Sequence, residues 1–294
     1  MKNELYKSDN TLDIDIGDMT VSVFAVTHMK KEGDGFFTDS HFHTAYEFQF
    51  ASEGSFTIAD EASTHLLHSG DFVVIPPGTF HFNVVDESLS RCTLRFSITS
   101  NGKGRDGFSE YCFYRRILDA ISGITVLSSV RISRDVERII NNNSTGPEAR
   151  HRMQIYTALL ITDILQHIKE IKNIPDTQGG DGKQSDGLSA EDERIKYIIE
   201  TCISECFNTD TVSDKIAQAL SMSKRNSARV VKRLLGENIS DIVTKQRMHM
   251  AKTLIKKTDR QLNDIAEAVG YKTYVAFFTA FKKYYEISPT ELRE

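Results

Sequence analysis

Two hydrophobic periods divide the chain. Between about residues 20 and 99, apolar residues alternate with polar ones or form short runs, which Gly and Pro separate. This pattern predicts β-strands, because successive side chains of a strand point to opposite faces. The strands that we expect cover residues 21–26, 46–50, 55–58, 72–75, 82–85 and 92–98. Many short strands with regular turns are typical of a sandwich or a small barrel.

After residue 130 the apolar positions recur with a helical period instead. They predict a short helix over residues 133–142 and a long amphipathic helix over residues 147–172, which would pack as a hairpin. Residues 173–192 then contain four glycines, one proline and almost no apolar side chain, which indicates a flexible linker. Near its end, Ser189 followed by Asp192 resembles a helix N-cap with an acidic first turn.

The last 34 residues combine two short helical patterns around one glycine. The first is amphipathic, and Gly270 ends it, because glycine accepts the left-handed conformation that a helix end needs. The second carries apolar residues from Val275 onward and ends in Lys282 and Lys283. Two helices joined by a tight turn predict a helix-turn-helix, whose second helix can enter a DNA major groove.

A second unit of the same kind precedes it. A helix over residues 211–220 is followed by Ser223, a natural N-cap, and by a helix over residues 224–235 that Gly236 stops. A further helix over residues 240–257 would join the two units. Its 18 residues at a rise of about 1.5 Å give roughly 27 Å, against about 34 Å between successive major-groove faces. Both units could therefore read one face of bent DNA.

The string IAEAVGY, followed by a Phe, by FKK and by SP at fixed spacing over residues 265–289, resembles the C-terminal signature of the AraC/XylS family of bacterial transcription regulators. In the first unit, Arg229, Lys232 and Gly236 match the family pattern. Ser227 and Val231 depart from it, because the family usually has Leu and Phe at these positions, which predicts a weaker core for the first unit. The resemblance implies sequence-specific DNA binding under the control of a small molecule.

In the second unit, Thr279 stands where the family often has Arg, and Glu286 stands where it usually has Gly. We therefore expect weaker hydrogen-bond readout at Thr279 and a different final turn at Glu286. The resemblance also implies that the hairpin over residues 133–172 is a homodimer interface. The other interpretation of this hairpin is that it only covers the core of the strand-rich region.

Roles follow for the two recognition helices. Arg225 and Arg229 are one turn apart and suit guanine, Asn226 suits adenine, and lysines at helix ends suit phosphates, which position the protein without specifying a sequence. The residues that we expect to read bases are Arg225, Asn226, Arg229, Lys272, Tyr274, Val275 and Thr279. The residues that we expect to contact phosphates are Lys232, Lys282 and Lys283.

The strand-rich region contains closely spaced histidines. His41 and His43 are two residues apart, so on a strand they face the same side, and residues that face the inside of a small barrel converge on one cavity. The spacings from Gly35 to Gly54 and from Gly70 to His81 resemble the two motifs of cupin barrels. The second motif departs at its last position, where Asn is expected at Val85 and Asn83 is found instead.

In metal-binding cupins, the positions that match His41, His43, Glu47 and His81 hold the ligands. These donors suit Mn, Fe, Ni, Cu or Zn. The alternatives are an organic-ligand pocket without a metal, because AraC-type sensor domains commonly keep an HxHxxxE string, and purely structural histidines. With Glu47 facing inward, Gln49 also faces inward, while Phe48 and Phe50 face the other layer. The pocket residues that we expect are His41, His43, Glu47, Gln49, His81, Asn83 and Arg95.

Length and charge agree with this division. The 294 residues exceed one typical domain. Residues 193–294 contain 18 Lys and Arg against 13 Asp and Glu, whereas residues 1–192 contain 18 against 28. A basic C-terminal region suits a DNA reader attached to a region that is not one. We therefore expect an α+β multidomain protein. Its predicted parts are a cupin-like barrel over 1–108, a helical dimerisation segment over 109–172, a linker over 173–192 and a DNA-binding domain with two helix-turn-helix units over 193–294.

The remaining features exclude several classes. No apolar run reaches the roughly 18–20 residues of a membrane span, and the N-terminus lacks an apolar signal core. The four cysteines show no disulfide or zinc spacing. Cys202 and Cys206 lie one turn apart on a predicted helix, where buried thiols are the expected interpretation. These features favour a cytoplasmic protein.

The leading interpretation is a ligand-responsive transcription regulator without enzyme activity. Its expected partners are double-stranded DNA, a small-molecule effector such as a sugar, a second copy of the chain and RNA polymerase. No cofactor follows with certainty, although a divalent transition metal could occupy the barrel. The alternatives are a metal sensor and, less favoured, a metal-dependent enzyme fused to a DNA-binding domain.

Overall fold

A computed structural model describes residues 2–6, 12–32, 36–38, 40–85, 88–103, 109–142, 147–176 and 188–293. Gly35 of the first cupin-like motif and residues 177–187 of the predicted linker lie outside this part of the chain. The chain divides into two compact units. The first comprises Met1–Phe37, His43–Thr79 and Asn83–Arg194, and the second comprises Thr38–Phe42, Phe80–Phe82 and Ile195–Glu294.

The first unit is built on an antiparallel sheet. Its main path runs β1-β3-β9-β5-β7-β10, with β2 on β3, β6 on β5, and β8 on both β4 and β5. The strands are β1 (Lys2–Tyr6), β2 (Leu12–Ile16), β3 (Met19–Lys31), β4 (Phe36–Phe37), β5 (Tyr46–Ala59), β6 (Thr64–His68), β7 (Asp71–Ile75), β8 (Phe82–Val85), β9 (Leu89–Ser100) and β10 (Thr125–Ser128). Because the main path runs from β1 to β10 without closing, the observed fold matches the expectation at the level of an antiparallel sheet.

All six predicted strands fall within observed ones. The two predicted over residues 46–50 and 55–58 are a single strand, β5, which pairs with β7 and β9 in its first part and with β6 from Ser55 onward. Gly54 lies between these parts at φ +76°, and a Cβ there would meet Ser88 O at 2.1 Å. Only glycine fits such a site. Strands β1, β2, β4, β6 and β10 were not predicted.

The two faces of the sheet differ in what covers them. Phe48 and Phe50 of β5 belong to a core that includes residues of the helices, such as Ile132 and Leu160. The alternate face carries a smaller apolar cluster. Its buried members are Ala51, Phe56, Ile58, Leu67, Val73, Ile75, Val85 and Leu89. The expected alternation along β5 is confirmed, since Phe48 and Phe50 face away from the side that carries Ala51.

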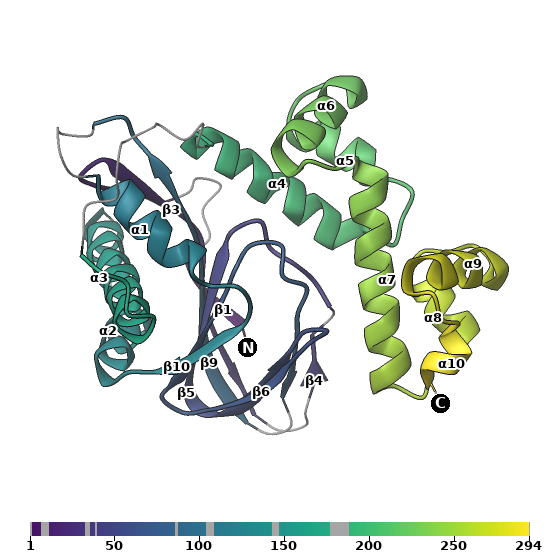
Figure 1. The fold of residues 1–294 in the computed structure, drawn as a ribbon, viewed down its shortest axis with the longest axis horizontal. Helices are drawn as coiled ribbons and strands as arrows, with labels where there is room; N and C mark the ends of the chain where they lie inside the picture. Colours follow the sequence, from purple (N-terminus) through teal and green to yellow (C-terminus); the bar gives the residue numbers. More distant parts are fainter. Residues whose placement is uncertain are drawn as a thin grey trace. The chain divides into compact units, whose positions relative to one another are not determined.

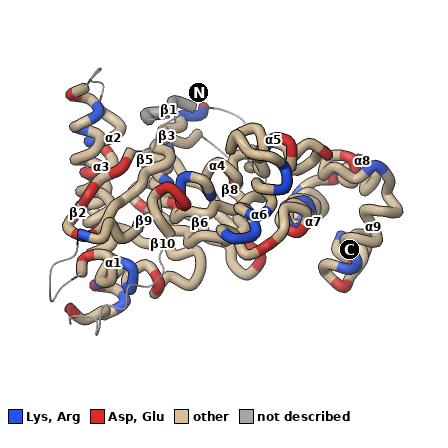
Figure 2. The backbone as a smooth tube through the Cα atoms, turned by 90° about the horizontal axis from the view of Figure 1, so that it is seen from above, with Lys and Arg blue, Asp and Glu red and all other residues tan. Residues whose placement is uncertain are grey.

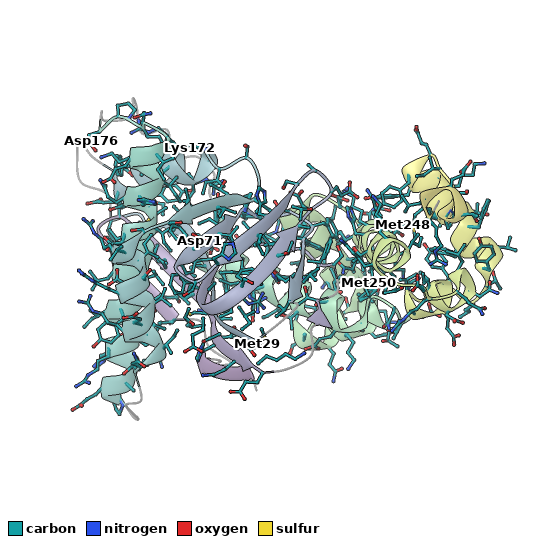
Figure 3. The ribbon with its side chains drawn as sticks, turned by 90° about the horizontal axis from the view of Figure 1, so that it is seen from below. Met29, Asp71, Lys172, Asp176, Met248 and Met250 are labelled. Atoms are coloured by element: carbon teal, nitrogen blue, oxygen red, sulfur yellow. The ribbon has the colours of Figure 1, made fainter. Side chains whose placement is uncertain are left out.

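Among the described residues, three whole helices belong to the first unit: α1 (Glu110–Asp119), α2 (Val130–Ile140) and α3 (Pro147–Ile171). The predicted hairpin corresponds to α2 and α3, which lie side by side (Figure 1). Lys172 and Asp176 follow the end of α3 (Figure 3). Helix α1 was not predicted. Asp18 holds its first turn, because the carboxylate accepts hydrogen bonds from Ser109 Oγ at 2.5 Å and from the Tyr111 amide at 3.0 Å.

The helices of the C-terminal part are α4 (Ala190–Cys206), α5 (Val212–Ala219), α6 (Lys224–Leu235), α7 (Ile239–Lys257), α8 (Leu262–Ala268), α9 (Tyr274–Tyr285) and α10 (Pro289–Arg293). Helix α4 begins with the predicted cap, because Ser189 Oγ accepts from the Asp192 amide at 3.1 Å. Met248 and Met250 of α7 (Figure 3) are buried. Helix α7 matches the predicted connector to within one residue at its start.

Helix α7 also holds the short segments that the second unit draws from before residue 83. Gln246 is buried and its Nε2 donates to Ser40 O at 2.6 Å. The Phe80 ring stacks on His249, with centroids 3.7 Å apart and planes within 4° of parallel. His41 and His81 are therefore direct chain neighbours of residues that contact α7. No helix in the described part of the chain is long and apolar enough to cross a membrane.

Candidate functional site

The C-terminal helices form two helix-turn-helix units with the same turn. In the first, the amides of Ser221 and Met222 donate to carbonyls of α5, and Ser221 has φ +51°. In the second, Gly270 and Tyr271 donate to carbonyls of α8 in the same way, and Gly270 has φ +88°. This pairing of two successive amides with the preceding helix is a Schellman-type ending. The predicted left-handed glycine is confirmed at Gly270.

The two second helices, α6 and α9, have equal lengths and matching ends. Ser223 caps α6 by accepting from the Asn226 amide, as predicted, and Thr273 caps α9 by accepting from Ala276. The C-caps Gly236 and Glu286 both lie in the left-handed region, at φ 76° and 63°. A different final turn at Glu286 was expected, and this prediction is wrong. The two helices therefore correspond position by position at an offset of 50 residues.

Helix α6 presents a polar, cationic surface. Arg225, Asn226, Arg229 and Lys232 are all exposed, and Figure 2 shows Lys and Arg along this helix. The Lys232 ammonium donates to Gly236 O at 2.8 Å, at the end of the same helix. The other face carries Val231 and Leu234 into the core. Two guanidinium groups and one amide thus reach solvent from one helix, as base readout requires.

Helix α9 presents a more apolar surface. Val275 is 73% exposed, Thr279 is exposed, and its hydroxyl donates to Val275 O at 2.9 Å. Lys282 and Lys283 are also exposed, whereas Tyr274 is half-buried. Lys272 was expected on this helix, but α9 begins at Tyr274, so Lys272 lies in the preceding turn. The second helix thus offers methyl groups and two late cations.

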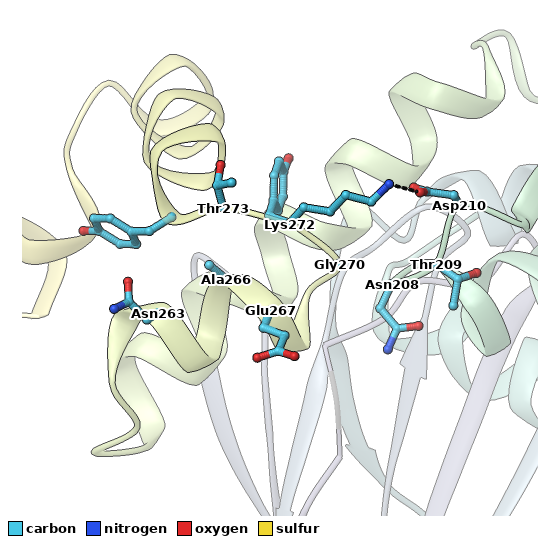
Figure 4. A pocket seen from close by; sticks show the side chains of 11 residues that line it. Asn208, Thr209, Asp210, Asn263, Ala266, Glu267, Gly270, Lys272 and Thr273 are labelled. Carbon is cyan, nitrogen blue, oxygen red and sulfur yellow. Dashed lines mark ion pairs between the residues drawn. The ribbon is translucent and has the colours of Figure 1, made fainter.

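Lys272 is engaged beside the turn. Its ammonium lies 2.8 Å from an Asp210 carboxylate oxygen (Figure 4), and this pairing lowers the pKa of Asp210 and raises that of Lys272. The pair borders a cavity of about 550 Å³ between the loop after α4 and the second turn. A Cβ on Gly270 would meet Asn208 O at 2.5 Å. Close backbone approach thus adds a second reason for glycine here.

The predicted pocket residues gather partly in the first unit. His43 Nε2 lies 3.1 Å from Glu47 Oε2, and Arg95 Nη1 lies 3.4 Å from His43 Nδ1. Because a guanidinium can only donate, His43 Nδ1 must accept, and the ring proton belongs on Nε2, where it faces Glu47. Both nitrogens of a neutral His43 are then occupied. A metal bound by His43 would have to displace one of these contacts.

The other two histidines face each other across an isolated bridge. The backbones of His41 and His81 exchange hydrogen bonds of 2.8 and 3.0 Å, and their rings are 4.5 Å apart. One ligand atom from each of His41, His43, Glu47 and His81 lies within 4.8 Å of all the others. Three imidazoles and one carboxylate fit a divalent transition metal if the hydrogen bond between Arg95 and His43 is broken.

Deeper on the same face, Gln49 and Asn83 are buried, each 1% exposed. The sequence reasoning missed Arg91, which is 9% exposed and donates from Nη1 to Gln49 Oε1 at 3.0 Å. Burial lowers the pKa of the Arg91 guanidinium, and the nearby Glu47 charge opposes this shift. A period of two along β9, counted from the predicted Arg95, would lead to Thr93 and Arg91, which lie opposite Gln49 and Ala51 of β5. The missing information was how far along β5 and β9 the polar face extends.

Comparison with known proteins gives matches of two lengths. A family model described as a helix-turn-helix domain matches residues 216–294. The HTH-type transcriptional regulator YisR of Bacillus subtilis is 21% identical over 281 residues, which cover 89% of this chain and 92% of that protein. The xylose operon regulatory protein of Escherichia coli K12 is 28% identical over 81 residues, covering 28% of this chain and 21% of that protein.

Among solved structures, the C-terminal domain of AraT, a response regulator from Geobacillus stearothermophilus, is 32% identical. The match covers 36% of this chain and 85% of that domain, with a TM-score of 0.32. The chain thus spans most of YisR but less than two thirds of the xylose operon regulator. The shorter matches are of a length that the C-terminal helices alone can account for.

Proposed function

We propose that the chain is an AraC-type helix-turn-helix transcription regulator, and that a small molecule bound by the sheet unit controls DNA binding by α6 and α9. The observation that carries the proposal is the repeated unit. Two exposed helices share a capping scheme and a turn, and each has a cationic end. Such a pair reads two adjacent stretches of a major groove.

The two helices contribute differently to recognition. On α6, Arg225 and Arg229 donate to guanine and Asn226 pairs with adenine. On α9, Val275 and the Thr279 methyl contact thymine methyls, with Tyr274 beside them. Lys272 also contacts a base once its ion pair with Asp210 is broken. The ammonium groups of Lys232, Lys282 and Lys283 contact phosphates. Helix α7 has 19 residues and spans about 28 Å, which suits readers in successive grooves about 34 Å apart.

The sensor in this proposal is a cupin-like pocket around His41, His43, Glu47 and His81. Gln49, Asn83 and Arg95 supply further polar groups, and a carbohydrate or a related molecule is the effector class that we favour. We favour an organic effector over a resident metal. A metal sensor is the second candidate, supported by the four-ligand grouping.

Helices α2 and α3 provide a dimer interface in this proposal. Ile155 and Leu159 lie one turn apart on α3 and are 57% and 44% exposed. Exposed apolar side chains at this spacing are typical of a helix that packs against another copy. Dimerisation would bring two pairs of recognition helices to one operator and allow a contact with RNA polymerase.

The effector acts through α7. The segments that carry His41 and His81 contact this helix through Ser40 and Phe80, and α7 connects α6 to α8. An effector shifts DNA affinity only if it binds one arrangement of these segments more tightly than the other. Occupation of the pocket would therefore favour one relation between the two recognition helices.

DNA selection followed by fluorescence anisotropy tests the proposal. The full chain should select a sequence with two motifs about one helical turn apart and bind it more tightly than random DNA. Gln246→Ala should leave this binding intact and reduce its response to effector. The absence of any selected sequence would reject the proposal, and an unchanged effector response in Gln246→Ala would reject the role of α7.

Native mass spectrometry of the full chain separates the two sensor candidates. A metal-free protein that retains or takes up an organic molecule supports the first candidate. One metal per chain, lost in His81→Ala, supports the metal sensor. In that case Arg95→Ala should tighten metal binding, because it frees His43 Nδ1. Arg260→Ala, which changes an exposed arginine between α7 and α8, is the matched control.

A further inference from the structure

The polar face of β5 and β9 carries more positive than negative charge. The register places Glu47, Gln49 and Ala51 of β5 opposite Arg95, Thr93 and Arg91 of β9. Two guanidinium groups therefore share this face with one carboxylate. These six residues therefore contain one more guanidinium group than carboxylate groups.

Arg91 is the more buried of the two arginines. Within the described residues, its one side-chain hydrogen bond goes to the neutral amide of Gln49, it forms no ion pair, and its buried Nε has no hydrogen-bond partner. The guanidinium also lies 5.2 Å from the centroid of the Phe56 ring. A buried charge that lacks a partner destabilises a folded protein. Its presence is explained if an anion completes the site.

We propose that the effector is a small hydroxylated molecule that bears an oxyanion, a carboxylate or a phosphate, and that Arg91 binds this group. A guanidinium offers parallel N–H groups that match a planar carboxylate or a phosphate. Gln49 and Asn83 would hydrogen-bond hydroxyl groups, and the apolar cluster around Phe56 and Val73 would cover the carbon skeleton. This inference rests on the proposed sensor role and adds the charge of the ligand to it.

Matched ligand pairs provide the test. The full-length protein is titrated, at constant ionic strength, with galacturonate against galactose and with glucose 6-phosphate against glucose, and thermal unfolding is followed. At least one oxyanion should raise Tm while its neutral partner does not. The carboxylate and phosphate arms identify which oxyanion the site accepts. Arg91→Gln, which removes the charge and shortens the side chain by two bonds but keeps a polar end group, should weaken binding of that ligand by about 10- to 100-fold.

Arg91→Met provides a readout that needs no ligand. If the function of Arg91 is to bind an anion, Arg91→Met should be at least as stable as the wild-type protein in the absence of ligand. The reason is that the substitution removes a buried charge. A structural arginine would instead give a large fall in Tm. Arg260→Gln, at an exposed position between α7 and α8, controls for the general effect of one lost charge.

The inference is overturned if no oxyanion stabilises the wild-type protein, if each neutral partner stabilises it equally, or if stabilisation persists in Arg91→Gln. A neutral sugar could stabilise both the wild-type protein and Arg91→Gln and also change DNA affinity. This result would reject the claim that the effector is an anion and would support the proposed sensor role. An oxyanion that binds through Arg91 without changing DNA affinity would keep the present inference and reject the proposed regulation. The two failures are therefore distinguishable.

Discussion

The two helix-turn-helix units share the same backbone arrangement but differ in the side chains of their core and of their surface. At the offset of 50 residues, Ser227 corresponds to Phe277 and Val231 to Phe281, and all four side chains are 0% exposed. On the outer side, Arg225 corresponds to Val275 and Arg229 to Thr279. The first unit therefore combines small core residues with a charged surface, and the second combines two aromatic rings with an apolar surface.

This difference indicates that the two helix-turn-helix units contribute unequally to the stability of the fold and to the recognition of DNA sequence. Burial of a phenylalanine contributes far more than burial of a serine or valine. Arginines, by contrast, discriminate between bases by hydrogen bonding, whereas methyl contacts do so less strongly. We infer that α9 anchors the C-terminal part and that α6 carries most of the sequence preference.

The largest effect should come from the core of the second unit. Phe277→Ala should destabilise this unit by about 3–5 kcal/mol, because it leaves a cavity where a fully buried ring stood. The matched change Ser227→Ala removes only a hydroxyl that donates to Lys224 O, and it should change stability by less than about 1 kcal/mol. Hydrogen exchange of the amides in α6 and α9 measures both. Equal losses in the two variants would contradict the comparison.

The sequence predicted the helices better than the sheet. The C-terminal helices follow from a local period, from caps such as Ser223, and from glycines at positive φ such as Gly236 and Gly270. These signals need no distant partner. Glu286 shows the limit of this reasoning, because the left-handed turn is retained although a non-glycine residue occupies it.

The sheet depends on pairings between distant residues. Strands β1 and β10 pair with β3 and β7, far away along the chain, and their own sequences give little indication of this. Helix α1 was missed although Ser109 caps it. Arg91 was missed for a related reason. Its position opposite Ala51 becomes known only from the register between β5 and β9. The roles assigned to the pocket residues and the domain boundaries stay predictions.

The next largest effect concerns base readout. Arg229→Ala should cost about 1–3 kcal/mol at the selected DNA sequence and relax the preference at one base pair. The corresponding change Thr279→Ala should cost less, because it removes a methyl contact and no guanidinium. Anisotropy with the selected sequence and its single-base variants measures both. A uniform loss over all sequences would make Arg229 a phosphate contact instead.

A smaller effect concerns the lysines at the helix ends. Lys282→Ala should reduce the slope of log K against log salt by about 1 and leave the sequence preference unchanged. Lys256→Ala, an exposed change on the connector helix α7, is the matched control and should leave the slope unaltered. Titrations at several salt concentrations give the slopes. A changed base preference in Lys282→Ala would show that this side chain reaches the base edges.

The smallest effect concerns the turns, where each unit combines one glycine with one non-glycine residue at positive φ. A non-glycine residue in this conformation costs roughly 1–2 kcal/mol, and glycine loses part of that advantage through its greater freedom in the unfolded chain. Ser221→Gly and Glu286→Gly should therefore each stabilise the protein by about 1 kcal/mol or less. Thermal unfolding of the single and double variants measures these gains.

The existing glycines provide the opposite test. Gly236→Ala should cost about 1 kcal/mol from its backbone conformation alone, because a Cβ there would meet nothing within 4 Å. Gly270→Ala should cost more, because the same conformation is combined with a contact of 2.5 Å to Asn208 O. If the two variants lose equal stability, the loop at Asn208 must move to accommodate the added methyl group. The turn of the second unit would then be held by its own helices alone.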